Sequence, residues 1–227
     1  MKPWEKLAST NAPDGELIEL RRRGHEYVIY AGGYDLMSSE DDASSIALSE
    51  LGCKHLSGQP SACVLVGGLG MGYTLRAALD RVTKSSVVEI AELVSGVVDW
   101  NREWLGDLAG KPLDDPRTKL LLGDVAKPIA AAKNKYGAIL LDVDNGPDSL
   151  AHAANDNLYS KSGIERAFRA LRPGGVLGVW SFDDDKGFTK RLGKAGFIVT
   201  THKVSASKKG RGRYHQIWTA KKPKSSV

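Results

Sequence analysis

The chain has 227 residues, 41% of them hydrophobic and 26% charged, and its formal net charge is +5. This length and composition suit a soluble α/β domain with a small appendage. No apolar run approaches the roughly 20 residues that cross a bilayer, and no apolar segment follows the charged N-terminus, so we expect neither a membrane span nor a secretory signal. The default location is therefore cytoplasmic. Two cysteines without further ligands at metal-site spacing predict reduced thiols and no metal.

The N-terminal region has the pattern of a short β-hairpin followed by a helix. Residues 1–15 show little periodicity and predict a loose lead-in, whereas 16–21 and 26–30 predict two strands. A helix is expected over 44–56. Such a hairpin is too small to be stable alone, so it must pack on the rest of the chain.

A glycine-rich turn follows the first apolar run of the larger part. Val64–Val66 predicts a buried strand, and Gly68, Gly70 and Gly72 separate it from an amphipathic helix. In this context backbone N–H groups and a helix N-terminus approach a nucleotide-like ligand closely. The third glycine comes one residue too early for a dinucleotide fingerprint, and the spacing is closer to the nucleoside-binding turn of S-adenosylmethionine folds. The alternative is a tight turn that only packs the helix on the strand.

Apolar and amphipathic segments alternate through the rest of the chain. Strands are expected at 63–66, 86–90, 118–122, 138–143 and 176–182, with helices at 91–105, 162–171 and 186–195. The last two strands, 197–203 and 214–220, have no helix between them and should pair antiparallel. The pattern predicts an α/β fold: a Rossmann-like, mostly parallel sheet with helices on both faces and a C-terminal antiparallel hairpin, preceded by the short N-terminal β-hairpin.

Acidic residues are expected at the carboxyl ends of three of these strands. Glu89 ends the apolar run that follows the glycine turn, where a carboxylate can accept hydrogen bonds from a ribose. Asp124 and Asp142 follow the next two strands. Because ligands bind at the carboxyl ends of parallel strands, these residues indicate a ribose-bearing cofactor at one edge of the sheet.

Several segments in order resemble the spermidine synthase (polyamine aminopropyltransferase) family over roughly residues 16 to 220. They are Val64 to Gly72, Val88-Glu89-Ile90, Gly123-Asp124, Leu140 to Pro147, Leu158-Tyr159 and Ala170 to Gly175. The resemblance implies an N-terminal region, 1–57, and a transferase domain of the S-adenosylmethionine type, 58–227. It further implies that Glu89 binds the ribose hydroxyls, that Asp124 accepts from the adenine amino group, and that the three glycines line the amino-acid side of the cofactor. An alternative for Asp124 is a cap on the following helix.

Asp142 is the candidate catalytic residue. A carboxylate at the end of a core strand, facing the cofactor, can act as base and as cation anchor for an attacking amine. The family pattern has two aspartates, of the type Asp-Ser-Thr-Asp-Pro, whereas this chain has Asp142-Val-Asp144-Asn-Gly-Pro. Asp144 either replaces the second carboxylate or shapes an Asn-Gly turn.

The acceptor side departs from the family. Where the family places glutamine, tyrosine and a His-Glu pair, this chain has Leu36, Ser45, Ile46 and Ala47. Acidic runs at 40–42 and 183–185 either restore negative charge near the cleft or are solvated loop ends. Cofactor binding is therefore better supported than a diamine acceptor.

Three functions are compatible with these patterns. The first is aminopropyl transfer from decarboxylated S-adenosylmethionine to a small-molecule amine, with Asp142 as base; by resemblance this enzyme is a homodimer. The second is methyl transfer from intact S-adenosylmethionine to a small molecule or RNA. The third is a non-enzymatic module that docks nucleic acid through the basic loop 208–213. The first is favoured, because a pure binder has no need of carboxylates at three strand ends. The basic runs at 208–213 and 221–224 are more typical of a solvated loop and tail, so a nucleic-acid partner is not expected.

Overall fold

The computed structural model describes residues 3–143, 156–207 and 213–224. Its centre is a seven-stranded sheet in the order β10-β11-β9-β8-β5-β6-β7. Neighbouring strands from β9 through β7 in this order are parallel, whereas β11 pairs antiparallel with both β9 and β10. The strands are β5 (Cys63–Gly67), β6 (Val87–Glu92), β7 (Thr118–Leu122), β8 (Tyr136–Leu141), β9 (Leu171–Ser181), β10 (Ile198–Ser205) and β11 (Tyr214–Lys221). The predicted parallel sheet with a C-terminal antiparallel hairpin is confirmed.

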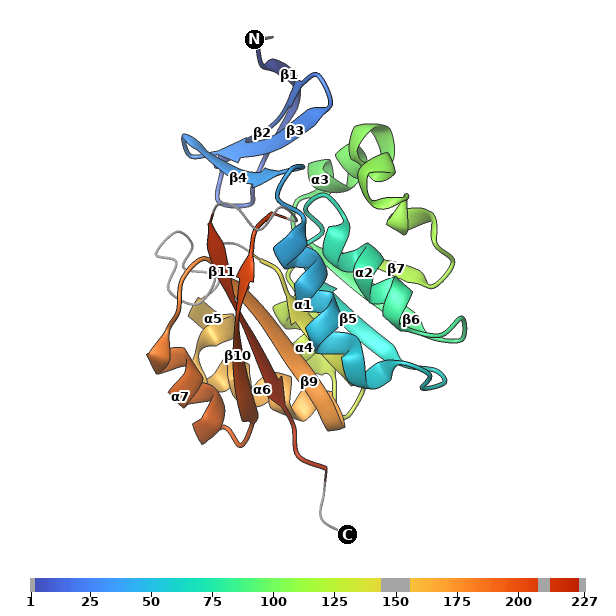
Figure 1. Cartoon of the computed structure of the whole chain (residues 1–227), viewed down its shortest axis with the longest axis vertical. Coiled ribbons are helices and arrows are strands. Elements are labelled where there is room, and N and C mark those ends of the chain that lie inside the picture. Colours follow the sequence, from blue (N-terminus) through green and yellow to red (C-terminus); the bar gives the residue numbers. More distant parts are fainter. Residues whose placement is uncertain (1–2, 144–155, 208–212, 225–227) are drawn as a thin grey trace.

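Helices cover both faces of this sheet (Figure 1). One face packs on α1 (Ala43–Cys53), α2 (Tyr73–Arg81) and α3 (Ser95–Trp100), and the other on α4 (Ala126–Ala131), α5 (Asp156–Tyr159), α6 (Lys161–Ala170) and α7 (Lys186–Lys194). Each face has its own apolar cluster, with Leu48 and Leu75 in the first and Ile164 and Phe188 in the second. Side chains of successive strand residues alternate between the two clusters, as they must in a sheet buried on both sides.

The N-terminal region is larger than the predicted hairpin. It is an antiparallel four-stranded sheet, β1 (Glu5–Asn11), β2 (Leu17–Arg23), β3 (Glu26–Ala31) and β4 (Tyr34–Ser38), paired in chain order. The expectation of a loose lead-in over residues 1–15 was therefore wrong. β1 is held by its backbone pairing with β2 and by the contact of Thr10 with Gly96 at the start of α3. These contacts do not require alternating apolar side chains, which is why the sequence pattern did not reveal the strand. Figure 1 shows this sheet at one end of the molecule and the C-terminus at the other.

Element boundaries differ from the predictions at three places. β6 runs on to Glu92, two residues beyond the expected end, and the following helix starts only at Ser95. That helix changes at Asn101 into a π-helical turn, Asn101–Leu105. β9 begins at Leu171, five residues before the expected start at 176, and its register with β8 is irregular between Leu171 and Val176. Within the described ranges no helix is both long and apolar enough to span a membrane.

Candidate active site

The glycine turn lies between β5 and α2, where the backbone bends sharply. Gly68, Gly70 and Gly72 have φ values of +86°, +49° and +85°, a region that side chains other than glycine rarely adopt. A Cβ on Gly68 would collide with the carbonyl oxygen of Asp142, so the turn and the end of β8 approach backbone to backbone. The turn therefore needs glycine for its conformation and for the close approach of its neighbour.

The N-terminal sheet packs against this turn. A Cβ on Gly70 would lie 2.8 Å from the sulfur of Met37, which comes from β4. The Tyr73 hydroxyl donates to the carbonyl of Ser39, just beyond β4, at 3.2 Å. The end of β4 therefore lies directly against the glycine turn.

Glu92, which the sequence analysis did not select, is the acidic residue at the carboxyl end of β6. Its two carboxylate oxygens accept the backbone N–H groups of Leu69 and Val94, each at 2.8 Å. Glu92 therefore links the glycine turn to the segment that enters α3. The available signal was an acid two positions after the apolar run, which becomes meaningful once the strand is known to continue.

Glu89 lies in the middle of β6, and the prediction that it ends the strand was wrong. Positions 89 and 92 are an odd number of residues apart, so their side chains lie on opposite faces of the sheet. The buried Glu89 carboxylate accepts from Lys135 Nζ at 2.7 and 2.8 Å and from the Tyr136 hydroxyl at 2.8 Å. Burial raises the pKa of Glu89, but the Lys135 and Tyr136 bonds outweigh it and hold that pKa below its usual value. These partners are at the start of β8, away from the glycine turn.

Asp142 follows β8 directly and lies beside the glycine turn. Its N–H donates to the carbonyl of Gly67 at 2.9 Å, which fixes the backbone at the end of the strand. Its carboxylate accepts a short hydrogen bond from the Thr74 hydroxyl in α2 and another from Ser45 in the first turn of α1. Burial raises the pKa of Asp142, and the two hydroxyls oppose this rise. The result is a carboxyl group oriented by two helices in surroundings that favour its protonated form.

Asp124 follows β7, and its local contact is with the next helix. Its carboxylate accepts the N–H of Ala126, the first residue of α4, at 2.7 Å. This is a capping bond, and it leaves the second carboxylate oxygen of Asp124 for another donor. Asp144, the second predicted catalytic residue, lies outside the described residues, as does the basic loop 208–212.

Asn101 is a second functional candidate that the sequence analysis did not select. Its amide donates to the carbonyls of Gly70 and Val97 at 2.8 and 2.9 Å, while its buried Oδ1 has no hydrogen-bond partner among the residues that the structure describes. The π-helical turn that begins at this residue brings its side chain under the glycine turn. π-helical turns inside helices are frequent at functional sites. The signal in the sequence was an asparagine on an otherwise apolar helix face.

The residues that depart from the family pattern lie on β4 and α1, and α1 packs against β9 and β11. Leu36 is 46% exposed on β4, and the Ser44 hydroxyl lies 3.0 Å from Nδ1 of the buried His215. Trp180 and Phe182 pack edge-on against that histidine ring.

In the part of the chain that the structure describes, no group of three His, Cys, Asp or Glu side chains is placed to hold a metal ion.

Comparison with known proteins identifies the family to which this chain is similar. The family model for the spermine/spermidine synthase domain matches residues 31–182. A polyamine aminopropyltransferase of Nitrosomonas europaea is 35% identical over 122 residues, which cover 54% of this chain and 35% of that protein. Putrescine N-methyltransferase 2 of Nicotiana attenuata is 35% identical over 119 residues, which cover 52% and 30%. The matches thus span about a third of each of these relatives.

Solved structures agree in fold. The crystal structure of spermidine synthase from Thermotoga maritima superposes with a TM-score of 0.75 at 21% identity, covering 96% of this chain and 72% of that one. Spermidine synthase in complex with the transition-state analogue AdoDATO gives a TM-score of 0.74 at 20% identity, with the same coverage. Since the family model matches well over half of the chain, the protein belongs to the spermine/spermidine synthase domain family.

Proposed function

We propose that this chain transfers an aminopropyl group from decarboxylated S-adenosylmethionine to a small-molecule amine, with Asp142 as the base. The observation that carries the proposal is the carboxyl group of Asp142. It lies at the end of β8 against the glycine turn, and its partners there are the hydroxyls of Thr74 and Ser45. No cation pairs with it among the described residues.

The residues at this edge fit the nucleoside donor. In the left-handed glycine turn, side chains at Gly68, Gly70 and Gly72 would be strained and would crowd their neighbours, so glycine keeps the backbone there open to a ligand. We assign the ribose hydroxyls to Glu92 instead of Glu89, because Glu92 bonds the turn and stands at the strand end. Asp124 has the matching place after β7 for the adenine amino group. Asn101 holds the carbonyl of Gly70 and so positions the turn.

Asp142 is suited to handle the proton of the attacking amine. When bound, the donor supplies a carbon activated by a sulfonium leaving group. An alkylammonium must lose a proton before its nitrogen can attack, and a carboxylate whose pKa is raised by burial is a stronger base than one in water. Thr74 and Ser45 hold that carboxylate in place.

Methyl transfer from intact S-adenosylmethionine is the second candidate. It is favoured by one observation, the 35% identity with putrescine N-methyltransferases over about half of the chain. The same edge of the sheet accommodates either reaction, because the donors differ only in a carboxylate and in the carbon that is attacked. The departures at Leu36, Ser45, Ile46 and Ala47 leave the acceptor amine open in both cases. By the family resemblance we expect a homodimer, which light scattering on the purified protein tests.

Calorimetric titration with decarboxylated S-adenosylmethionine, intact S-adenosylmethionine and methylthioadenosine in parallel distinguishes the two reactions. Preference for the decarboxylated form supports aminopropyl transfer, and preference for the intact form supports methylation. Asp142→Asn should lower the turnover rate by about 10²–10⁴-fold, the usual contribution of a general base. The affinity for methylthioadenosine should stay within about threefold of the unaltered protein, since this ligand has no amine for Asp142 to deprotonate. Asp80→Asn, which removes an exposed carboxylate on α2, is the matched control. Full turnover by Asp142→Asn would refute its role as base.

A further inference from the structure

A second pocket lies at the other edge of the large sheet, where the parallel strands begin. It has a volume of about 180 Å³ and is formed where the end of α1 meets the starts of β8 and β9 and the end of β11. Its wall near α1 includes His55, whose Nε2 lies 3.0 Å from the carbonyl of Gly137. The glycine turn and Asp142 are at the opposite ends of these strands, so this pocket is separate from the candidate active site.

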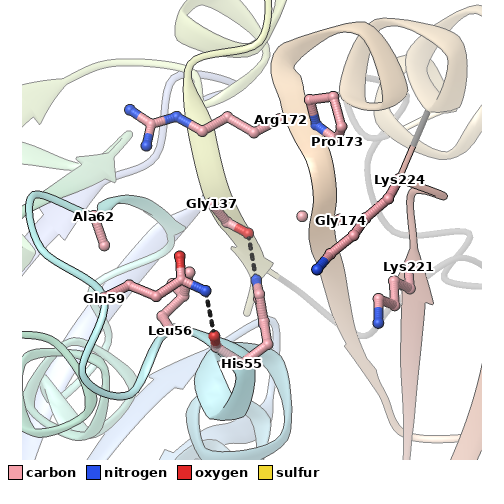
Figure 2. Close-up of a pocket in the computed structure, with 11 residues that line it drawn as sticks. His55, Leu56, Gln59, Ala62, Gly137, Arg172, Pro173, Gly174, Lys221 and Lys224 are labelled. Atoms are coloured by element: carbon pink, nitrogen blue, oxygen red, sulfur yellow. Dashed lines mark hydrogen bonds between the residues drawn. The ribbon is translucent and has the colours of Figure 1, made fainter. Parts of the chain in front are cut away.

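The charge of this pocket is entirely positive. Arg172, Lys221 and Lys224 line it, and the described residues of its lining include no carboxylate. Figure 2 shows the ammonium groups of Lys221 and Lys224 directed inward from one side, with Arg172 extending toward Ala62 on the other. None of the three cations has an ion pair within the described part of the chain, and all three are exposed.

Several arginines elsewhere in the structure do have a carboxylate partner. Arg22 and Arg81, on other faces, each lie within hydrogen-bond distance of a carboxylate, and Arg117 pairs with Asp115 at 2.7 Å. Three like charges that line one pocket, with no carboxylate among the described residues of its lining, repel one another and create a local positive potential. An anion that enters the pocket relieves this repulsion.

The backbone holds the cations in place. Gly174 N–H donates to the carbonyl of Lys222 at 3.0 Å, and Lys222 N–H donates to the carbonyl of Gly175 at 2.8 Å. The Lys222 ammonium donates hydrogen bonds to the carbonyls of Phe168 and Leu171, at 2.9 and 2.8 Å. Gly174 has a φ of +80°, and a Cβ there would press on the stem of Lys224. These contacts anchor the segment after β11, and they leave the two lysines that flank Lys222 directed at the pocket.

We propose that this pocket binds a compact anion of the phosphate class with at least two negative charges. Its volume is below the roughly 300 Å³ at which pockets for drug-sized ligands begin, so it suits a phosphate or pyrophosphate group and not a whole nucleotide. The planar guanidinium of Arg172 matches phosphate oxygens in pairs, and the lysines add point charges. The site is independent of the proposed transfer reaction, since it shares no residue with it.

Inorganic pyrophosphate is the probe, titrated calorimetrically into the full chain at about 0.05 M salt, where exposed charges are little screened. We expect Arg172→Gln and the double variant Lys221→Gln/Lys224→Gln each to weaken binding about tenfold or more, the loss expected for a charge-assisted hydrogen bond. The control is Lys190→Gln/Lys194→Gln on α7, which removes the same charge from two exposed lysines. It should change the affinity by less than about twofold.

The nuclear magnetic resonance signals of the His55 ring report where the anion binds. They should move on addition of pyrophosphate to the unaltered protein, and they should not move in the double variant. Absence of pyrophosphate binding, or equal weakening by the α7 control, would overturn the proposal. Binding of a short single-stranded oligonucleotide without binding of pyrophosphate would overturn the compact-anion assignment in favour of a nucleic-acid surface. Methylthioadenosine affinity, measured in parallel, reports the other edge of the sheet and is expected to be unchanged.

Discussion

Exchanging the two acidic residues of β6 for glutamine separates their roles. Glu92 accepts the N–H groups of Leu69 and Val94, and a glutamine amide cannot accept with its nitrogen. Glu92→Gln therefore loses one of these bonds or one bond to a ribose hydroxyl. A hydrogen bond to a charged group contributes about 1.5–3 kcal/mol. Since about 1.4 kcal/mol is tenfold in affinity, we expect methylthioadenosine to bind about 10- to 150-fold more weakly.

Glu89→Gln should have the opposite profile. Its carboxylate is bonded to Lys135 and Tyr136 at the start of β8 and does not reach the glycine turn. Nucleoside affinity should stay within about twofold, while the free energy of unfolding falls by about 1–3 kcal/mol, because one partner of a buried charged network loses its acceptor. The network contains Lys119 as well, at 3.8 Å, so part of the loss is a weakened longer-range attraction.

Calorimetric titration with methylthioadenosine, run beside urea unfolding of the same preparations, measures both effects. The unfolding curves show whether each variant is fully folded at the assay temperature. For a variant that is fully folded, a weaker affinity reports a lost ligand contact and not a loss of fold. Retained affinity in folded Glu92→Gln together with a large loss in folded Glu89→Gln would refute the assignment of the ribose to Glu92.

Three further predictions follow from the geometry. Gly68→Ala should lower the free energy of unfolding in urea by about 2 kcal/mol or more. A left-handed φ costs other residues about 1–2 kcal/mol, and the new Cβ would also meet a backbone carbonyl. The control is Gly193→Ala in α7, which has open space around it and should be neutral or stabilising in the same assay. Arg117 holds the pKa of Asp115 at about 2, below its ordinary 3.8. The stabilisation is therefore full above about pH 4 and is lost as the pH falls toward 2, so urea unfolding of Asp115→Asn should show a deficit at pH 7 that shrinks across this window. Burial raises the pKa of Cys53 to about 12, so a thiol reagent at pH 8 should modify it only after unfolding, as peptide mass mapping would show.

The order of elements in the transferase domain was predictable because each element has a strong local pattern. Val64–Val66 is continuously apolar, and so are the cores of the neighbouring strands, as expected for a parallel sheet buried on both faces. The glycines were predictable for a related reason, since close spacing of glycine after a buried strand has few structural uses other than a tight turn. Asp142 was found in the same way, as the polar residue that ends an apolar strand.

The N-terminal sheet and the acid at the end of β6 were not predictable from local patterns. β1 carries lysine, serine and threonine at positions that pair, and its backbone bonds to β2 are independent of side-chain type. Glu89 was selected because it was taken to end an apolar run, yet a strand ends where its ladder of hydrogen bonds ends. Pairing of Glu92 with Leu122 of β7 extends β6 to that residue.

The sequence by itself determined the class of fold, the glycine turn and the acids that follow β7 and β8, because periodicity and glycine spacing are properties of neighbouring residues. Only the tertiary structure decided which acid faces the turn, and that Thr74 and Ser45 from two helices orient Asp142. It also decided that Arg172 and two lysines from the far end of the chain line one pocket. Contacts between residues so distant in sequence depend on how the sheet is ordered and paired, which no local pattern records.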